Sequence, residues 1–135
     1  MEPVKVVAHF IDDAVEKGYA YNFDPTNTSF ILQKADGGSS GIQELNLKLK
    51  EIKAVFFVKT LEGNREYHER KDFMEGDRLL GRRVEVTFID GEVIRGYTLD
   101  YEPKRQGFFL IPIDPQSNNI QIFVVASAVM GVRFL

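Results

Sequence analysis

Three arginines near the middle of the chain could bind phosphate. Arg78 and Arg82 are four residues apart, and Arg83 follows directly. Guanidinium groups suit phosphate because their planar fork of N–H donors contacts two oxygens at once. This spacing makes the three arginines one candidate ligand site. A solvent-exposed position at the end of a short helix is the alternative explanation of the same spacing.

Aromatic and basic side chains also gather further along the chain, around an expected turn at 102–107. Tyr101 and Phe109 flank this turn, and Lys104 and Arg105 lie within it. Aromatic and arginine side chains carry much of the binding energy in protein interfaces. The four residues are therefore a second candidate surface, for a ligand or a partner. A mixture of core aromatics and ordinary surface charge is the alternative.

Residues suited to catalysis do not cluster in this sequence. It has no cysteine, which excludes disulfides and thiolate chemistry, and its two histidines, His9 and His68, lie far apart. The acidic residues between 62 and 75 alternate with basic ones, as on a solvated face. We therefore expect no enzyme activity, no catalytic or metal-binding residues and no cofactor. By the alternation of its strand, His9 is expected at the surface.

Composition narrows the class of protein. The chain has 135 residues, 44% of them hydrophobic, and a net charge of −3. No segment carries the basic excess that drives non-specific nucleic-acid binding. The N-terminus lacks the layout of a signal peptide, and no apolar run approaches the ~20 residues of a membrane span. We expect a cytoplasmic, bacterial-type protein without a membrane segment.

The elements that must position these residues recur within the chain. Phe10-Ile11-Asp12 returns as Phe88-Ile89-Asp90, 78 positions later, and the register holds without a gap as far as Asp114. Other identical pairs are Gly18 with Gly96, Tyr19 with Tyr97, Pro25 with Pro103, Phe30 with Phe108 and Leu32 with Leu110. After one deletion Val55 matches Val132. An internal repeat of this extent predicts two copies of one structural unit.

Each unit is expected to contain five short strands. Residues 83–88 alternate polar and apolar, and Asp90-Gly91 is a strong signal for a tight turn. Gly18 and Gly96 fall inside the second strand of each unit, where a small barrel bends sharply. The expected strands are 4–11, 15–23, 29–34, 42–49 and 54–58, then 83–88, 93–101, 108–112, 120–125 and 129–135. The glycine-rich segment 36–41 is interpreted as a hairpin loop rather than a phosphate cradle, because a strand follows it.

A charged connector separates the two units. Residues 59–80 have no counterpart in the repeat, and we expect a short helix near Asp77–Leu80, with Asp77 as its N-cap and Gly81 as its end. The expected organisation is a first β-barrel at 1–58, the connector at 59–80 and a second β-barrel at 81–135. The two barrels are expected to pack about a pseudo-twofold axis, or to merge their edge strands into one larger sheet.

The second unit resembles a known family of small barrels. Residues 81–110 resemble the first signature of Sm-like (LSm) proteins, and residues 122–132 resemble the second. The resemblance implies a bent five-stranded barrel of Sm or SH3 type, here duplicated in tandem as in uncharacterised bacterial domains. It also implies ring assembly through strand pairing and RNA binding in the pore. The family's Asp-x-x-x-Asn and Arg-Gly motifs are missing, however: Lys104 replaces the Asn, and Val125-Ala126 replaces Arg-Gly.

These observations favour a non-enzymatic interaction or regulatory module that binds a protein partner. An Sm-like RNA-binding ring is one alternative, and pairing of exposed edge strands would also allow a homo-oligomer. A cyclic-dinucleotide sensor is the other alternative, because Arg78-x-x-x-Arg82 resembles the arginine motif of PilZ domains. The second PilZ motif, Asp/Asn-x-Ser-x-x-Gly, does not follow it.

Overall fold

Both halves of the chain fold into strands. The computed structural model describes residues 3–34 and 43–135, so the segment 36–41 interpreted above as a loop lies outside the described residues. The first half contains β1 (Val4–Phe10), β2 (Val15–Tyr21), β3 (Ser29–Lys34), β4 (Glu44–Lys48), the 3-10 turn η1 (Leu49–Glu51) and β5 (Ile52–Val58). The second half contains β6 (Arg82–Phe88), β7 (Val93–Thr98), β8 (Gly107–Pro112), β9 (Asn119–Val125), η2 (Ala126–Ala128) and β10 (Val129–Phe134).

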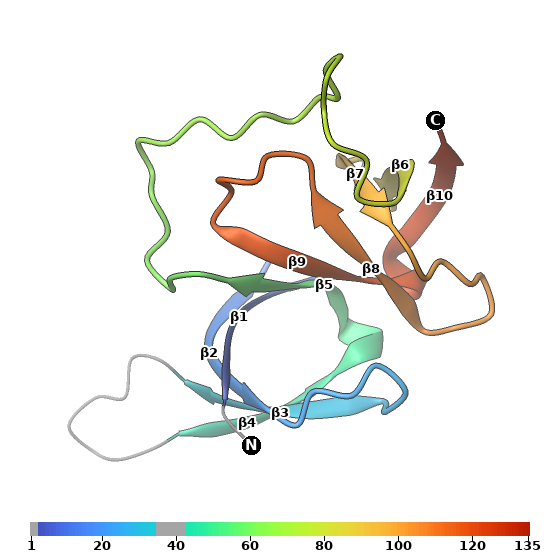
Figure 1. The fold of residues 1–135 in the computed structure, drawn as a ribbon. Coiled ribbons are helices and arrows are strands. Elements are labelled where there is room, and N and C mark those ends of the chain that lie inside the picture. The colour runs from blue at the N-terminus through green and yellow to red at the C-terminus, as the bar shows by residue number, and fades with distance from the viewer. Residues whose placement is uncertain (1–2, 35–42) are drawn as a thin grey trace.

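All ten strands form one antiparallel sheet, whose order is β10-β6-β7-β8-β9-β5-β1-β2-β3-β4. The two halves meet where β5 pairs with β9, and β10 and β4 lie at the two ends of the sheet. Figure 1 shows each half curling strongly around its own interior, with β5 and β9 side by side at the centre. The all-β class is therefore confirmed, and the edge strands merge into one sheet.

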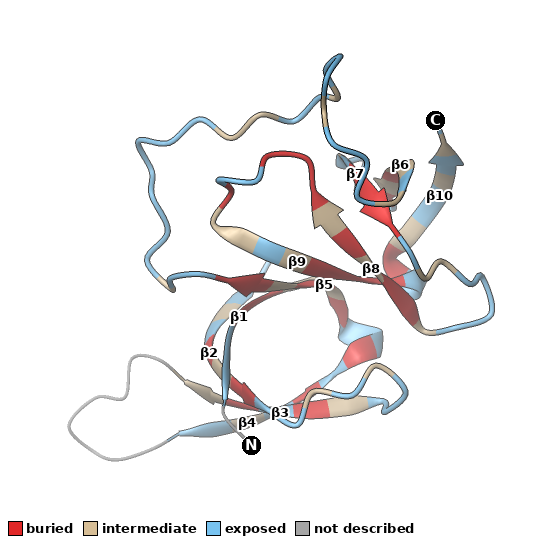
Figure 2. Cartoon of the chain, in the orientation of Figure 1, coloured by how far each residue is buried: buried red, intermediate tan, exposed pale blue. Residues whose placement is uncertain are grey.

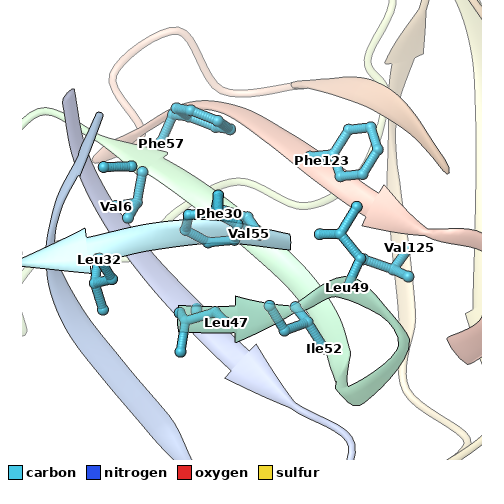
Figure 3. Close-up of a cluster of buried hydrophobic side chains, with 12 residues drawn as sticks. Val6, Phe30, Leu32, Leu47, Leu49, Ile52, Val55, Phe57, Phe123 and Val125 are labelled. Carbon is cyan, nitrogen blue, oxygen red and sulfur yellow. The ribbon is translucent and has the colours of Figure 1, made fainter. Parts of the chain in front are cut away.

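The sheet encloses two hydrophobic clusters. The first gathers the inward side chains of β1–β5, and the second those of β6–β10. β9 contributes to both, because successive side chains of a strand point to opposite faces. Phe123 and Val125 belong to the first cluster, whereas Ile122 and Val124 belong to the second. Figure 3 shows Phe123 and Val125 among the buried side chains of the first half.

The same succession of elements occurs in both halves with matching register. Val55 of β5 pairs with Ala8, and its counterpart Val132 of β10 pairs with Val86. The pairing of β1 with β5 shifts register after His9 of β1, opposite the start of β5. The pairing of β6 with β10 shifts register after Val129, at the start of β10. The strand assignments of the sequence are confirmed to within a few residues at each end.

Close backbone contact explains the two glycines inside β2 and β7. A Cβ at Gly18 would lie 2.1 Å from the carbonyl oxygen of Gln33, and one at Gly96 would lie 2.5 Å from that of Ile111. No side chain fits at such distances, so glycine is needed where neighbouring strands approach in the bend. This agrees with the sharp bend expected there.

Two expectations about the arrangement are wrong. Residues 77–80 form no helix, because the Asp77 carboxylate accepts hydrogen bonds from Met74 N–H and Arg70 within the preceding turn. The pseudo-twofold axis is also wrong. A twofold axis that pairs β5 with β9 would also pair their counterparts β10 and β4, which lie at opposite ends of the sheet.

The connector is held against the second half by hydrogen bonds. Asp114 is buried and accepts hydrogen bonds from the Tyr67 hydroxyl and from Arg70 N–H, the latter at 3.0 Å. Ser117 donates to Glu69 at 2.7 Å. Figure 1 shows the connector, in yellow-green, arching past the loop that joins β8 and β9.

Candidate partner-binding edge at β10

β10 presents an open edge beside half-buried apolar side chains. Within residues 3–34 and 43–135 its outer side has no strand partner. Val132 and Phe134 belong to the second cluster but are only partly buried, and Met130 next to them is 68% exposed. Figure 2 shows the contrast, with β5 and β9 largely red at the centre and β10 in tan and pale blue.

A pocket lies against this edge. Its lining includes Tyr101, Phe108, Val129 and Val132, and it encloses about 230 Å³. Arg105 and Glu102 belong to the same lining and add charge to it. Small-molecule sites usually enclose about 300–1,000 Å³. The volume therefore suits one large side chain better than a cofactor.

Three aromatic rings meet beside the pocket. Tyr101 packs edge-on against Phe108, with ring centroids 5.0 Å apart, and against Phe134 at 5.4 Å. The guanidinium of Arg82 covers Phe134, with Cζ 3.8 Å from the ring centroid. Such stacking holds the arginine beside the edge while leaving its N–H donors available. Leu79 and Leu135 line a second hollow next to Arg82.

The structure separates the three candidate phosphate ligands. Arg82 and Arg83 are neighbours on β6, so their side chains leave opposite faces of the sheet. Arg82 lies over Phe134, whereas Arg83 is half-buried with its Cζ 5.0 Å from the ring centroid of Phe73. Arg78 is exposed in the connector. Of the three guanidinium groups, that of Arg82 is the one stacked on a ring of β10.

The second candidate group is divided as well. Tyr101 and Arg105 line the pocket, and Lys104 is exposed in the same turn. Phe109 instead packs into the first cluster, with its ring centroid 5.1 Å from that of Phe123 and 6.0 Å from that of Phe57. It therefore contributes to the junction between the halves.

Sequence reasoning missed the residues of β10 itself. Val129, Val132 and Phe134 were expected as ordinary strand residues. The repeat carried a signal, because Val55 and Phe57 of β5 correspond to Val132 and Phe134. The pairing of β5 with β9 shows that β9 covers Val55 and Phe57, whereas no strand covers Val132 and Phe134 among the described residues.

His9 is not a surface residue as expected. It is half-buried, and its ring lies 4.6 Å from that of Phe56 in the sheet. Burial lowers the pKa of His9 below its usual value, so the neutral imidazole is favoured. Within residues 3–34 and 43–135, no group of three or more His, Cys, Asp or Glu residues could hold a metal ion. The same residues contain no helix long and apolar enough to cross a membrane.

Fold and site together define an all-β protein with two curved five-stranded halves in one sheet and an open apolar edge. The chain belongs to a family of unknown function, DUF6982, whose family model matches residues 2–135. No curated protein and no solved structure matches the chain.

Proposed function

We propose that this protein is a non-enzymatic interaction module, built from two tandem Sm- or SH3-like barrels, that binds a protein partner at the β10 edge. The observation that carries the proposal is the unpaired strand beside the apolar pocket of Tyr101, Phe108 and Val132. An extended segment of the partner adds to the sheet as a further strand. Backbone hydrogen bonds to an edge strand supply affinity, and neighbouring pockets supply specificity.

The orientation of the β10 backbone supports this mode of binding. Leu135 N–H donates to Arg83 O at 3.0 Å, on the β6 side. Because amides alternate in direction along a strand, the N–H groups of Phe134 and Val132 point to the open side. An exposed edge of this kind templates pairing unless it is blocked. Gly131, which directly precedes Val132, has no side chain to cover the backbone.

The partner in this proposal is another protein rather than a second copy of the chain. Among residues 3–34 and 43–135, the other end of the sheet is β4, which would meet β10 of a second copy head to tail. The register of β3 with β4, and of β8 with β9, makes Asn46 the counterpart of Phe123 and Lys48 that of Val125. Pairing β4 with β10 would turn an amide and an ammonium group toward an apolar pocket, which is costly without partners. The same cost weighs against a ring of copies that binds RNA.

Comparative affinity purification tests the proposal. Gly131→Lys puts a long charged side chain on the open edge, and a Cβ at Gly131 meets no atom within 4 Å, so the fold is retained. Asn46→Lys makes the same change at the opposite end of the sheet, where Asn46 is exposed. Thermal melting establishes that both variants are folded.

The expected result is a defined set of proteins that wild type and Asn46→Lys both retain and that Gly131→Lys loses at least tenfold. Retention of the same set by Gly131→Lys would contradict the proposal. Equal loss from both variants would also contradict it, because the effect would then not belong to β10.

A further inference from the structure

We infer that the β10 edge binds an extended segment whose pattern is acidic, aromatic, any residue, apolar. This inference rests on the proposed function and names the chemistry of the partner. The evidence is the junction of the two halves. There β9 pairs with β5, which is the counterpart of β10 in the first half.

The aromatic packing of the two halves matches, except that the first half also receives two rings, Phe109 and Phe123, from the second. In the first half Phe23 packs edge-on against Phe30 at 5.0 Å and Phe57 at 5.3 Å. In the second half their counterparts Tyr101, Phe108 and Phe134 pack with separations of 5.0 and 5.4 Å. The first half has a further ring, Phe123 of β9, 5.4 Å from Phe23.

The pocket at β10 lies where that further ring would be. Residues lining it are the counterparts of residues that surround Phe123 in the first cluster: Tyr101 of Phe23, Phe108 of Phe30, and Val132 of Val55. Phe123 is only 1% exposed and Val125 only 2%, so the junction buries both. An aromatic residue, followed two positions later by an apolar one, therefore completes the second half as β9 completes the first.

The outer face of β10 adds a charge preference. Phe56 of β5 pairs directly with Ile122 of β9, and the counterpart of Phe56 is Arg133. The Arg133 side chain is 70% exposed and pairs with the Glu85 carboxylate at 3.1 Å, which also pairs with Arg95. Opposite charges directly across an antiparallel pair are favourable. An acidic residue immediately before the aromatic one matches this position.

The loop beside the pocket offers a further hydrogen-bonding site. At the junction the Gln106 amide donates to the carbonyls of Pro25 at 3.1 Å and Asn27 at 3.0 Å. The counterparts of these acceptors are the carbonyls of Pro103 and Arg105, which border the pocket. A donor near the end of the bound segment can use them in the same way.

Fluorescence anisotropy with synthetic peptides tests the inference. The probe is a fluorescein-labelled peptide with the sequence of residues 119–126, carrying Ile122→Glu and Val124→Thr. One control peptide adds Phe123→Ala, and the other has Ile122→Lys in place of Ile122→Glu. All three are titrated with the full chain, and with the full chain carrying Arg133→Glu or Gly131→Lys.

The expected result is saturable binding of the probe, at least tenfold weaker binding after Phe123→Ala, and loss of binding to Gly131→Lys. The glutamate peptide should bind the wild type about two- to fivefold better than the lysine peptide, and Arg133→Glu should reverse that preference. Equal binding of all three peptides would overturn the inferred pattern while leaving strand addition at β10 intact.

Absence of peptide binding would also overturn the pattern. The proposed function would then depend on the purification experiment alone, because it fails only if Gly131→Lys retains the partner proteins or if Asn46→Lys loses them equally. The two failures are therefore distinguishable.

Discussion

Single glycines decide which positions of this sheet accept a side chain. Gly18 has no room for a Cβ, because the Gln33 carbonyl oxygen would lie 2.1 Å away, whereas a Cβ at Gly131 meets nothing within 4 Å. The first glycine is therefore required by the fold. Gly131 is different: its counterpart in β5 is the buried Ala54, and the missing side chain leaves the β10 edge open to another backbone.

Gly18→Ala is expected to destabilise the protein by about 2–4 kcal/mol, because the added methyl group forces β2 and β3 apart. Gly131→Ala is the matched control. It should leave the free energy of unfolding unchanged or raise it by up to about 1 kcal/mol, since alanine loses less entropy in a strand. Urea denaturation measures both. Equal effects of the two substitutions would contradict the close contact described at Gly18.

At the scale of elements, the connector depends on one buried carboxylate. The Tyr67 hydroxyl, donating to Asp114, is the main cause that lowers the pKa of Asp114, and Arg70 N–H and Gln116 N–H add to it. The ionised carboxylate thus holds residues 67–70 against the loop between β8 and β9. A neutral side chain at this position accepts these bonds more weakly.

Asp114→Asn is expected to cost about 1–3 kcal/mol at pH 7, because the Tyr67 hydroxyl and the Arg70 and Gln116 amides lose their charged acceptor. A carboxyl whose pKa is lowered on folding stabilises the protein above the pKa of the unfolded state, about 4, and this stabilisation is lost as the pH falls through the folded value. The difference in free energy of unfolding between wild type and Asp114→Asn should therefore shrink below about pH 4. Urea denaturation from pH 3 to 7 measures it, with Glu62→Gln as the control on an exposed connector carboxylate. A difference in unfolding free energy that stays constant from pH 3 to 7 would contradict the stabilising role of the ionised Asp114 carboxylate.

The sequence predicts those elements that depend only on residues close together in the chain. Strand alternation and the Asp90-Gly91 turn gave the strands, because a period of two and a tight turn depend on neighbouring residues only. The helix expected at Asp77 failed since Arg70, seven residues away, occupies the capping carboxylate. The sequence left Phe109 between a partner surface and the core, because its contacts with Phe57 and Phe123 depend on the pairing of β5 with β9.

At the scale of the whole molecule, the two ends of the sheet are unlike the junction at its centre. The central pairing buries Phe123 and Val125, whereas β4 presents Asn46 and Lys48 at the corresponding positions. Head-to-tail growth is therefore disfavoured at β4, while β10 keeps the apolar side chains of a receiving strand. This asymmetry supports the proposal that the open edge binds a different protein.

Restoring the junction residues on β4 should create self-association. We expect wild type to sediment as a monomer and the double variant Asn46→Phe with Lys48→Val to form head-to-tail oligomers whose size rises with concentration. Adding Gly131→Lys to the double variant should return it to a monomer. Analytical ultracentrifugation measures all three. A double variant that stays monomeric would contradict the equivalence of the two edges.

Amide hydrogen exchange followed by NMR tests strand addition at β10 most directly. The full chain is compared with and without a saturating amount of the peptide that carries Ile122→Glu and Val124→Thr. We expect slowed exchange of the Val132 and Phe134 amides, which face the open side, and unchanged exchange in β4. Unchanged exchange at Val132 and Phe134, or protection at β4 instead, would contradict strand addition at β10.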